Sequence, residues 1–153
     1  MFYSLNNKIF KETEHTISIN NRSFRYGDGF FETIKLIDNS IQLKQYHFNR
    51  IAKSIDILKF ELPKYFSFDT LEQQIISIAQ KNNHSNSARI RLTFFRNDEG
   101  LFEVKSNQPN ILIQSFALPK TNNILNENGL VIDVYPLAKK SDDIFSNIKS
   151  NNY

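Results

Sequence analysis

Cysteine and tryptophan are both absent from these 153 residues, and there are only four glycines and four prolines. Without cysteine the chain can form neither disulfides nor thiolate metal sites, which fits a reducing compartment and leads us to expect a cytoplasmic protein. No apolar run approaches the roughly 18 residues that a membrane-spanning helix needs. The first residues also lack the charged and apolar regions of a signal peptide. We therefore expect no membrane partner.

Clustered positive charge is missing as well. The net charge of +3 comes from nineteen basic and sixteen acidic residues that are spread along the whole chain. Proteins that bind nucleic acid usually gather lysine and arginine on one face or in a tail. The three histidines are not spaced as metal ligands, and the sequence has no phosphate-binding glycine loop. The composition thus favours neither a nucleic-acid partner nor a metal site.

Aromatic residues are plentiful, with fourteen phenylalanines and six tyrosines in a chain that is 40% apolar. Their pattern predicts strands over residues 1–5, 8–11, 30–37, 41–43, 88–95 and 110–118. Apolar residues spaced by three and four predict a helix from Gln45 that stops before Pro63, and a second from residue 69 or 70 to 81, capped by Asp69. The buried faces of these helices should carry Phe48, Ile51, Ala52, Ile55, Leu58, Leu71, Ile75, Ile78 and Ala79.

The order of these elements predicts an α+β domain over residues 1–118, with an antiparallel sheet and two main helices. Residues 119–129 begin with a proline and a polar run, which indicates a linker. Residues 130–135 have the pattern of a further strand. Because residues 130–153 are too few to bury a core of their own, we expect them to be the start of a second domain that is incomplete here.

Two of the four glycines fall in the segment Phe24–Thr33, on either side of Asp28. Glycine alone adopts positive φ freely, so Gly27 and Gly29 predict a tight turn or a close approach of another group. A strand pattern follows directly. By itself this segment fits a hairpin corner as well as it fits a binding site.

Several cations stand in positions that suit anions. His47 and Arg50, three residues apart, share one face of the first predicted helix, and the planar fork of an arginine matches phosphate. A solvated helix face is the alternative. Arg89 and Arg91 share one face of a predicted strand, where two guanidinium groups repel unless water or an anion separates them. Arg96, at the end of that strand, could join them in recognising a carboxylate.

Four segments in order resemble the class IV aminotransferases. They are Arg25–Thr33 (RYGDGFFET), His47–Arg50 (HFNR), Arg89–Arg91 (RIR) and Ile148–Asn152 (IKSNN). This family comprises fold-type IV pyridoxal-phosphate enzymes, namely branched-chain and D-amino-acid aminotransferases and 4-amino-4-deoxychorismate lyase. The resemblance implies a small N-terminal domain, a linker and a larger C-terminal domain with the cofactor between them, and it implies a homodimer.

The resemblance also implies roles for individual residues. Lys149, a lysine that nothing else in the sequence distinguishes, matches the lysine that bonds covalently to pyridoxal 5′-phosphate. Arg50 matches the arginine that holds the cofactor phosphate. Tyr26 and Phe31 match residues that line the substrate pocket. Arg89, Arg91 and Arg96 fall where members place groups that recognise the substrate carboxylate.

The residues around the lysine favour some family members over others. In branched-chain enzymes the lysine is followed by a glycine-containing run, whereas Lys149 is followed by Ser150, Asn151, Asn152 and Tyr153. This pattern slightly favours the lyase or a D-amino-acid enzyme, although Asn97 replaces the glycine that those groups often carry. A branched-chain L-amino-acid aminotransferase is the alternative, and a non-catalytic dimerisation module is another. Because members continue far beyond the lysine, we expect the chain to be an N-terminal portion that is inactive alone.

Overall fold

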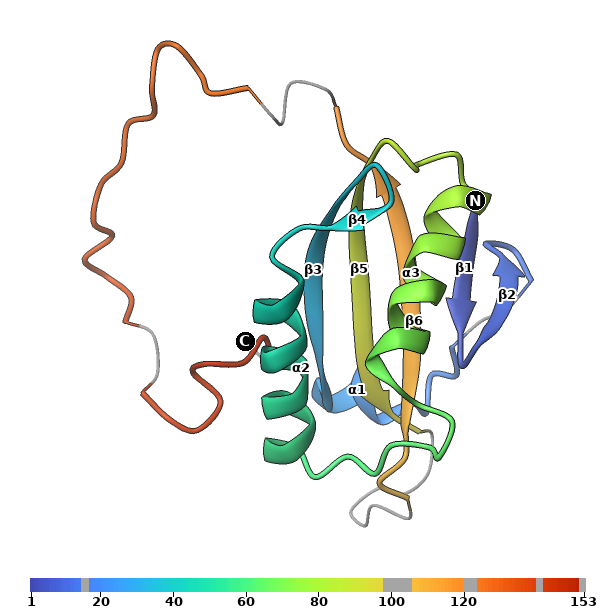
Figure 1. The fold of residues 1–153 in the computed structure, drawn as a ribbon. Helices are drawn as coiled ribbons and strands as arrows, with labels where there is room; N and C mark the ends of the chain where they lie inside the picture. Colours follow the sequence, from blue (N-terminus) through green and yellow to red (C-terminus); the bar gives the residue numbers. More distant parts are fainter. Residues whose placement is uncertain (15–16, 98–105, 120–123, 140–141, 152–153) are drawn as a thin grey trace.

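The computed structural model describes residues 1–14, 17–97, 106–119, 124–139 and 142–151. Within them, six antiparallel strands form one sheet in the order β2-β1-β6-β5-β3-β4 (Figure 1). The strands and helices in chain order are β1 (Phe2–Leu5), β2 (Lys8–Lys11), α1 (Arg22–Tyr26), β3 (Gly29–Ile37), β4 (Ser40–Ile41), α2 (Lys44–Ile57), α3 (Phe68–Lys81), β5 (Ser87–Arg96) and β6 (Pro109–Ala117). This architecture confirms the predicted α+β class.

The core lies between one face of the sheet and the two long helices. Side chains alternate along β3, so that Phe30, Glu32, Ile34 and Leu36 face the helices while Phe31 faces the other way. The rings of Phe30 and Phe94 stack in this core with their centroids 4.8 Å apart. The buried residues predicted for the second helix are all buried in α3. Hydrophobic periodicity was a reliable guide here because α3 packs against a single layer.

Three local predictions are wrong. Ser67, not Asp69, caps α3, because its hydroxyl and that of Thr70 form a reciprocal capping box. Ala52 is exposed on α2, whereas Ser54 is buried. Burial is tolerated there because the Ser54 hydroxyl donates a hydrogen bond to the Arg50 carbonyl oxygen at 2.7 Å. The strand expected over residues 41–43 ends at Ile41.

The strand predicted over residues 130–135 does not form. These residues have no regular secondary structure, and their apolar side chains are exposed. Figure 1 shows residues 124–139 running away from the sheet before the chain returns toward α2. An isolated strand has no partner for its backbone groups, so the pattern alone cannot produce one.

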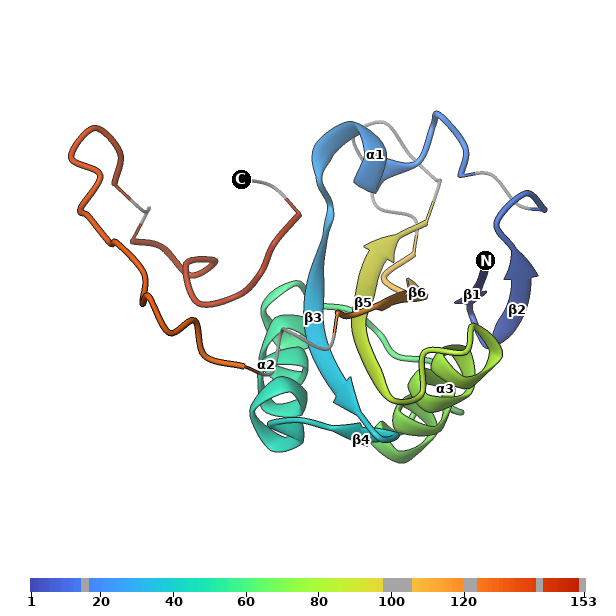
Figure 2. The ribbon, with the colours of Figure 1, turned by 90° about the horizontal axis from the view of Figure 1, so that it is seen from above.

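A short helix that the sequence did not predict covers the opposite face of the sheet. Figure 2 shows α2 and α3 on one side of the sheet and α1 on the other. Asn21 caps α1, accepting hydrogen bonds from the backbone N–H groups of Ser23 and Phe24, and Gly27 ends it with φ of +64°. No helix in the described residues is long and apolar enough to cross a bilayer.

Candidate active site around Lys149

The segment containing Lys149 is attached to the outer edge of β3. The backbone N–H of Phe31 donates to the carbonyl oxygen of Lys149 at 2.9 Å, and that of Asn151 donates to the carbonyl oxygen of Gly29 at 2.9 Å. Phe30 and Ser150 form the antiparallel bridge between these bonds, and Ile148 is buried. Lys149 is therefore positioned by main-chain pairing with a strand that lies far from it in the sequence.

Glycine is required at the two positions around Asp28 for different structural reasons. Gly27 has positive φ at the end of α1. A Cβ on Gly29 would clash with the carbonyl oxygen of Phe94 and would lie 2.8 Å from the side-chain nitrogen of Asn151. Gly29 is thus the point where β5 and the Lys149 segment both approach the backbone closely. The expectation of a tight turn and a close approach is confirmed.

A cavity of about 930 Å³ opens beside this segment. Three of the residues predicted for the site line it, namely Tyr26, Phe31 and Lys149, together with Asp28 and Lys139. The amine nitrogen of Lys149 lies 5.8 Å from the centroid of the Phe31 ring. An amine beside an aromatic wall in a cavity of this size can meet a small-molecule ligand.

The three arginines of β5 occupy distinct environments. The guanidinium carbon of Arg91 lies 4.2 Å from the Phe31 ring centroid, so Arg91 and Lys149 contact the same aromatic ring. Arg89 lies two residues before Arg91 on β5, farther from the turn at residues 27–29, and it stacks over Phe116. Both side chains project from the face of the sheet that the two long helices leave open, whereas Arg96 projects from the opposite face.

Arg96 is a buried structural residue in this fold. It donates to Asp28 at 3.0 Å, to the side-chain oxygen of Asn107 at 2.8 Å and to the carbonyl oxygen of Leu58, and it stacks over Phe60. All three guanidinium nitrogens are occupied. The structure therefore does not bring Arg96 together with Arg89 and Arg91.

Arg50 extends from α2 toward Glu32 on β3. The Glu32 carboxylate is 1% exposed, and it accepts hydrogen bonds from Nε and Nη2 of Arg50 and from the ring of His47 at 2.8 Å. The hydrogen bond to Glu32 raises the pKa of Arg50 above its usual value, so the guanidinium stays charged. Glu32 was not among the residues predicted for the site. Its signal was an acidic residue at an inward position of an apolar strand.

Lys149 and Arg50 approach β3 from its two faces. Lys149 lies beside Phe31, while Arg50 bonds to Glu32, the next residue, whose side chain points the other way. The Lys149 segment pairs with residues 29–31 along the outer edge of β3, and Arg50, on α2, is not among the described residues that line the cavity beside it. The structure thus places the two predicted anchors beside consecutive residues of β3, but on its opposite faces.

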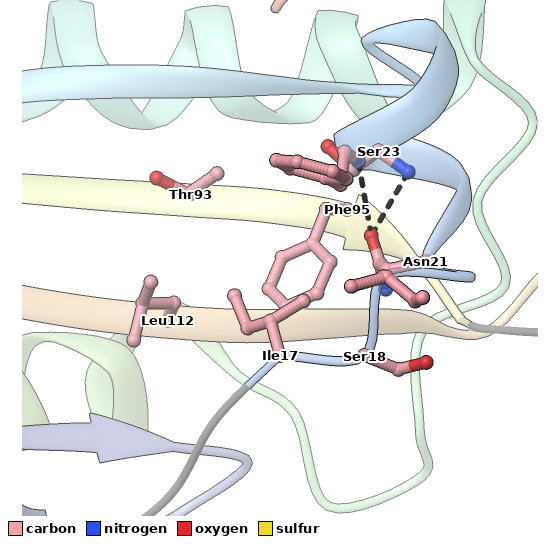
Figure 3. Close-up of a pocket in the computed structure, with 9 residues that line it drawn as sticks. Ile17, Ser18, Asn21, Ser23, Thr93, Phe95 and Leu112 are labelled. Carbon is pink, nitrogen blue, oxygen red and sulfur yellow. Dashed lines mark hydrogen bonds between the residues drawn. The ribbon is translucent and has the colours of Figure 1, made fainter. Parts of the chain in front are cut away.

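A second, smaller cavity of about 360 Å³ lies on the open face of the sheet, under the segment that leads into α1. Figure 3 shows Ile17 and Phe95 near the centre of the view, with Thr93 and Leu112 to their left along the strands, and all four line the cavity. The side-chain oxygen of Asn21 at its rim is occupied by the N–H groups that it caps. None of the predicted site residues lines this cavity.

Residues 29–153 match the model of the family described as amino-transferase class IV. The chain belongs to this family. A protein of Methanocaldococcus jannaschii, provisionally named a branched-chain-amino-acid aminotransferase, is 27% identical over 154 residues, which cover 97% of this chain and 51% of that protein. The chain thus spans about half the length of this relative.

Solved structures of branched-chain aminotransferases share the fold. The branched-chain aminotransferase of Thermoproteus uzoniensis, solved with norvaline, superposes with a TM-score of 0.67 at 20% identity, over 78% of this chain and 41% of that one. The Escherichia coli branched-chain enzyme gives a TM-score of 0.67 at 23% identity, over 76% and 41%. A further branched-chain aminotransferase, solved with pyridoxamine 5′-phosphate, gives 0.67 at 20%, over 78% and 41%. At these identities the likeness establishes the fold.

Proposed function

We propose that the chain supplies the sheet domain and the cofactor lysine of a pyridoxal-phosphate-dependent class IV aminotransferase. The observation that carries this proposal is the pairing of the Lys149 segment with β3, which holds the amine beside Phe31 in the lining of a cavity. A surface lysine without a function would not need its backbone to be held by a strand in this way. Membership of the family gives the position its chemical meaning.

The residues present fit this cofactor. An amine can bond to its aldehyde, and Arg50, on the other face of β3, is a charged donor suited to its phosphate. When bound, pyridoxal 5′-phosphate supplies a ring that absorbs negative charge from the substrate α-carbon. Lys149 would hold the cofactor and then move the α-proton once its amine is released. Phe31 would shield that amine from water.

Arg91 is the arginine that we assign to the substrate carboxylate. It shares the Phe31 ring with Lys149, whereas Arg89 lies over Phe116 and Arg96 has no nitrogen to spare. A branched-chain amino acid is the substrate class supported by the names of the relatives. The lyase and the D-amino-acid enzyme remain second candidates, because of the spacing after Lys149. A homodimer is part of the proposal.

The test of cofactor binding uses the longest polypeptide that contains residues 1–153. It is incubated with pyridoxal 5′-phosphate, reduced with borohydride, digested and analysed by mass spectrometry. We expect the added mass on Lys149, and its loss in Lys149→Arg. Lys139→Arg is the matched control, because Lys139 lines the same cavity. Labelling spread evenly over the surface lysines would contradict the proposal and leave only the non-catalytic module.

The test of the reaction offers the same polypeptide three substrates. Transfer of the amino group from a branched-chain L-amino acid would support the main proposal, and transfer from a D-amino acid would support the second candidate. Release of pyruvate with an aromatic amine from aminodeoxychorismate would identify a lyase. Light scattering measures the oligomeric state, for which we expect twice the monomer mass.

A further inference from the structure

Glu32 is the most deeply buried charged side chain of the described residues, at 1% exposure. It lies on the core side of β3, between Phe30 and Ile34, where water cannot solvate a carboxylate. A buried carboxylate is costly unless it is paired and hydrogen-bonded. Here it receives three hydrogen bonds, two from Arg50 and one from His47. These hydrogen bonds explain how the buried carboxylate is tolerated. They do not explain why a charged residue stands at this position.

The ion pair with Glu32 fixes the direction of the Arg50 guanidinium. Nε and Nη2 bond to the two oxygens of Glu32, which is the bidentate geometry that locks the guanidinium plane. Nη1 has no hydrogen-bond partner among the described residues, and the side chain is 33% exposed. Two of the three guanidinium nitrogens are therefore anchored in the protein, while Nη1 keeps its donors available on a side chain that is partly exposed.

Arg96 shows what a purely structural arginine looks like in the same fold. It is 8% exposed, and its three nitrogens are bonded to Asp28, Asn107 and Leu58. Arg50 has the same side chain and also a carboxylate partner, but it keeps one nitrogen outside the protein network. The difference points to a ligand that Nη1 of Arg50 would meet.

We propose that Glu32 is a positioning residue that aims Arg50 at the cofactor phosphate. This inference rests on the proposed function, and it goes beyond it by giving Glu32 a role. Glu32 neutralises the charge of Arg50, so it weakens any purely Coulombic attraction for an anion. The gain must then come from orientation, since donors held in advance lose little entropy when they bind.

Net charge and orientation predict opposite changes in phosphate affinity for Glu32→Gln. If net charge controlled phosphate affinity, removing the buried negative charge would strengthen binding. If orientation controls it, the variant loses the bidentate anchor and binds more weakly. The readout is the ratio of the affinities for pyridoxal 5′-phosphate and for pyridoxal, which lacks the phosphate. General damage to the fold lowers both affinities and leaves the ratio unchanged.

The experiment measures this ratio by fluorescence titration of the polypeptide used above. We expect Glu32→Gln to lower it about tenfold, the scale of one charge-assisted hydrogen bond. Glu72→Gln is the matched control, because Glu72 pairs with Lys44 at the surface, and it should leave the ratio unchanged. Where Glu32→Gln does not fold, Glu32→Asp keeps the charge but shortens the side chain, and it should lower the ratio as well.

A double-mutant cycle with Arg50→Lys tests whether Glu32 acts through Arg50. Lysine keeps the charge but cannot form the bidentate fork. In that background Glu32→Gln should change the ratio by less than about twofold, since there is no guanidinium left to orient. An unchanged or higher ratio in Glu32→Gln, or an equal loss in both backgrounds, would overturn the inference. A wild-type ratio near one would instead overturn the phosphate role of Arg50, and with it the proposed function.

Discussion

Asp28 and Arg96 are joined twice across the start of β3. Their side chains form an ion pair at 3.0 Å, and the backbone N–H of Arg96 donates to the carbonyl oxygen of Asp28 at 3.1 Å. Asp28 also accepts from Arg22 at 3.0 Å, so one carboxylate links α1, the turn and the end of β5. This turn forms one wall of the cavity that Lys149 lines.

Asp28→Asn should destabilise the protein because it leaves Arg96 buried without its charge partner. Removing one member of a buried pair costs about 3–5 kcal/mol, and since Asp28 keeps some contact with water we expect about 2–3 kcal/mol. Urea denaturation measures the change. Asp56→Asn is the control, because Asp56 meets Lys59 at the exposed surface, and its effect should stay within about 0.5 kcal/mol. Equal effects of the two substitutions would contradict this interpretation.

Gly29→Ala should disturb two elements at once. The new Cβ would press on the backbone of β5 and on Asn151, so the pairing of the Lys149 segment must shift. We expect a loss of about 1–3 kcal/mol in the free energy of unfolding. Hydrogen exchange should also quicken at the amides of Phe31 and Asn151. Gly129→Ala is the comparison: nothing lies within 4 Å of that position, so its cost should come only from its φ of +67°, and exchange at Phe31 and Asn151 should stay slow. Slow exchange retained at Phe31 would show that the edge pairing survives.

Arg91→Gln should weaken substrate binding far more than Arg89→Gln. A charge-assisted hydrogen bond contributes about 1.5–3 kcal/mol, so the KM of the accepted amino acid should rise about 10–100-fold in the first variant. In the second it should change less than about twofold, because Arg89 lies over Phe116, away from the Phe31 ring that Lys149 contacts. The two residues share a strand face and lie side by side on it, so they are close controls for each other. The reverse ranking would exclude our assignment.

Tyr3→Phe should make the protein less sensitive to alkaline pH. Burial, with a smaller contribution from Glu14, raises the pKa of the Tyr3 hydroxyl above 10.0. A raised pKa means that the folded state holds the proton more tightly than the unfolded state does, so stability falls as the pH rises through this range. Phenylalanine cannot ionise but can keep the stacking on Phe10. Denaturation midpoints between about pH 9 and 12 should fall less in the variant.

The sequence predicted the sheet domain because its signals are local. The alternation in β5 and the apolar spacing of Leu71, Ile75 and Ile78 in α3 depend on residues a few positions apart. The same reasoning failed for residues 130–135, where a strand pattern has no strand beside it. A propensity can specify the shape of a segment, but only a partner can satisfy its backbone.

By itself the sequence determined the fold class and the order of the motifs, since periodicity, turns and spacing are all written along the chain. Only the tertiary structure decided which cations belong together. It placed Arg91 and Lys149 on one phenylalanine ring, enclosed Arg96 among carbonyl and carboxylate oxygens, and set Glu32 behind Arg50. Such environments depend on residues far apart in the chain. Burial and pairing, not residue type, decide whether a charge supports the fold or can meet a ligand.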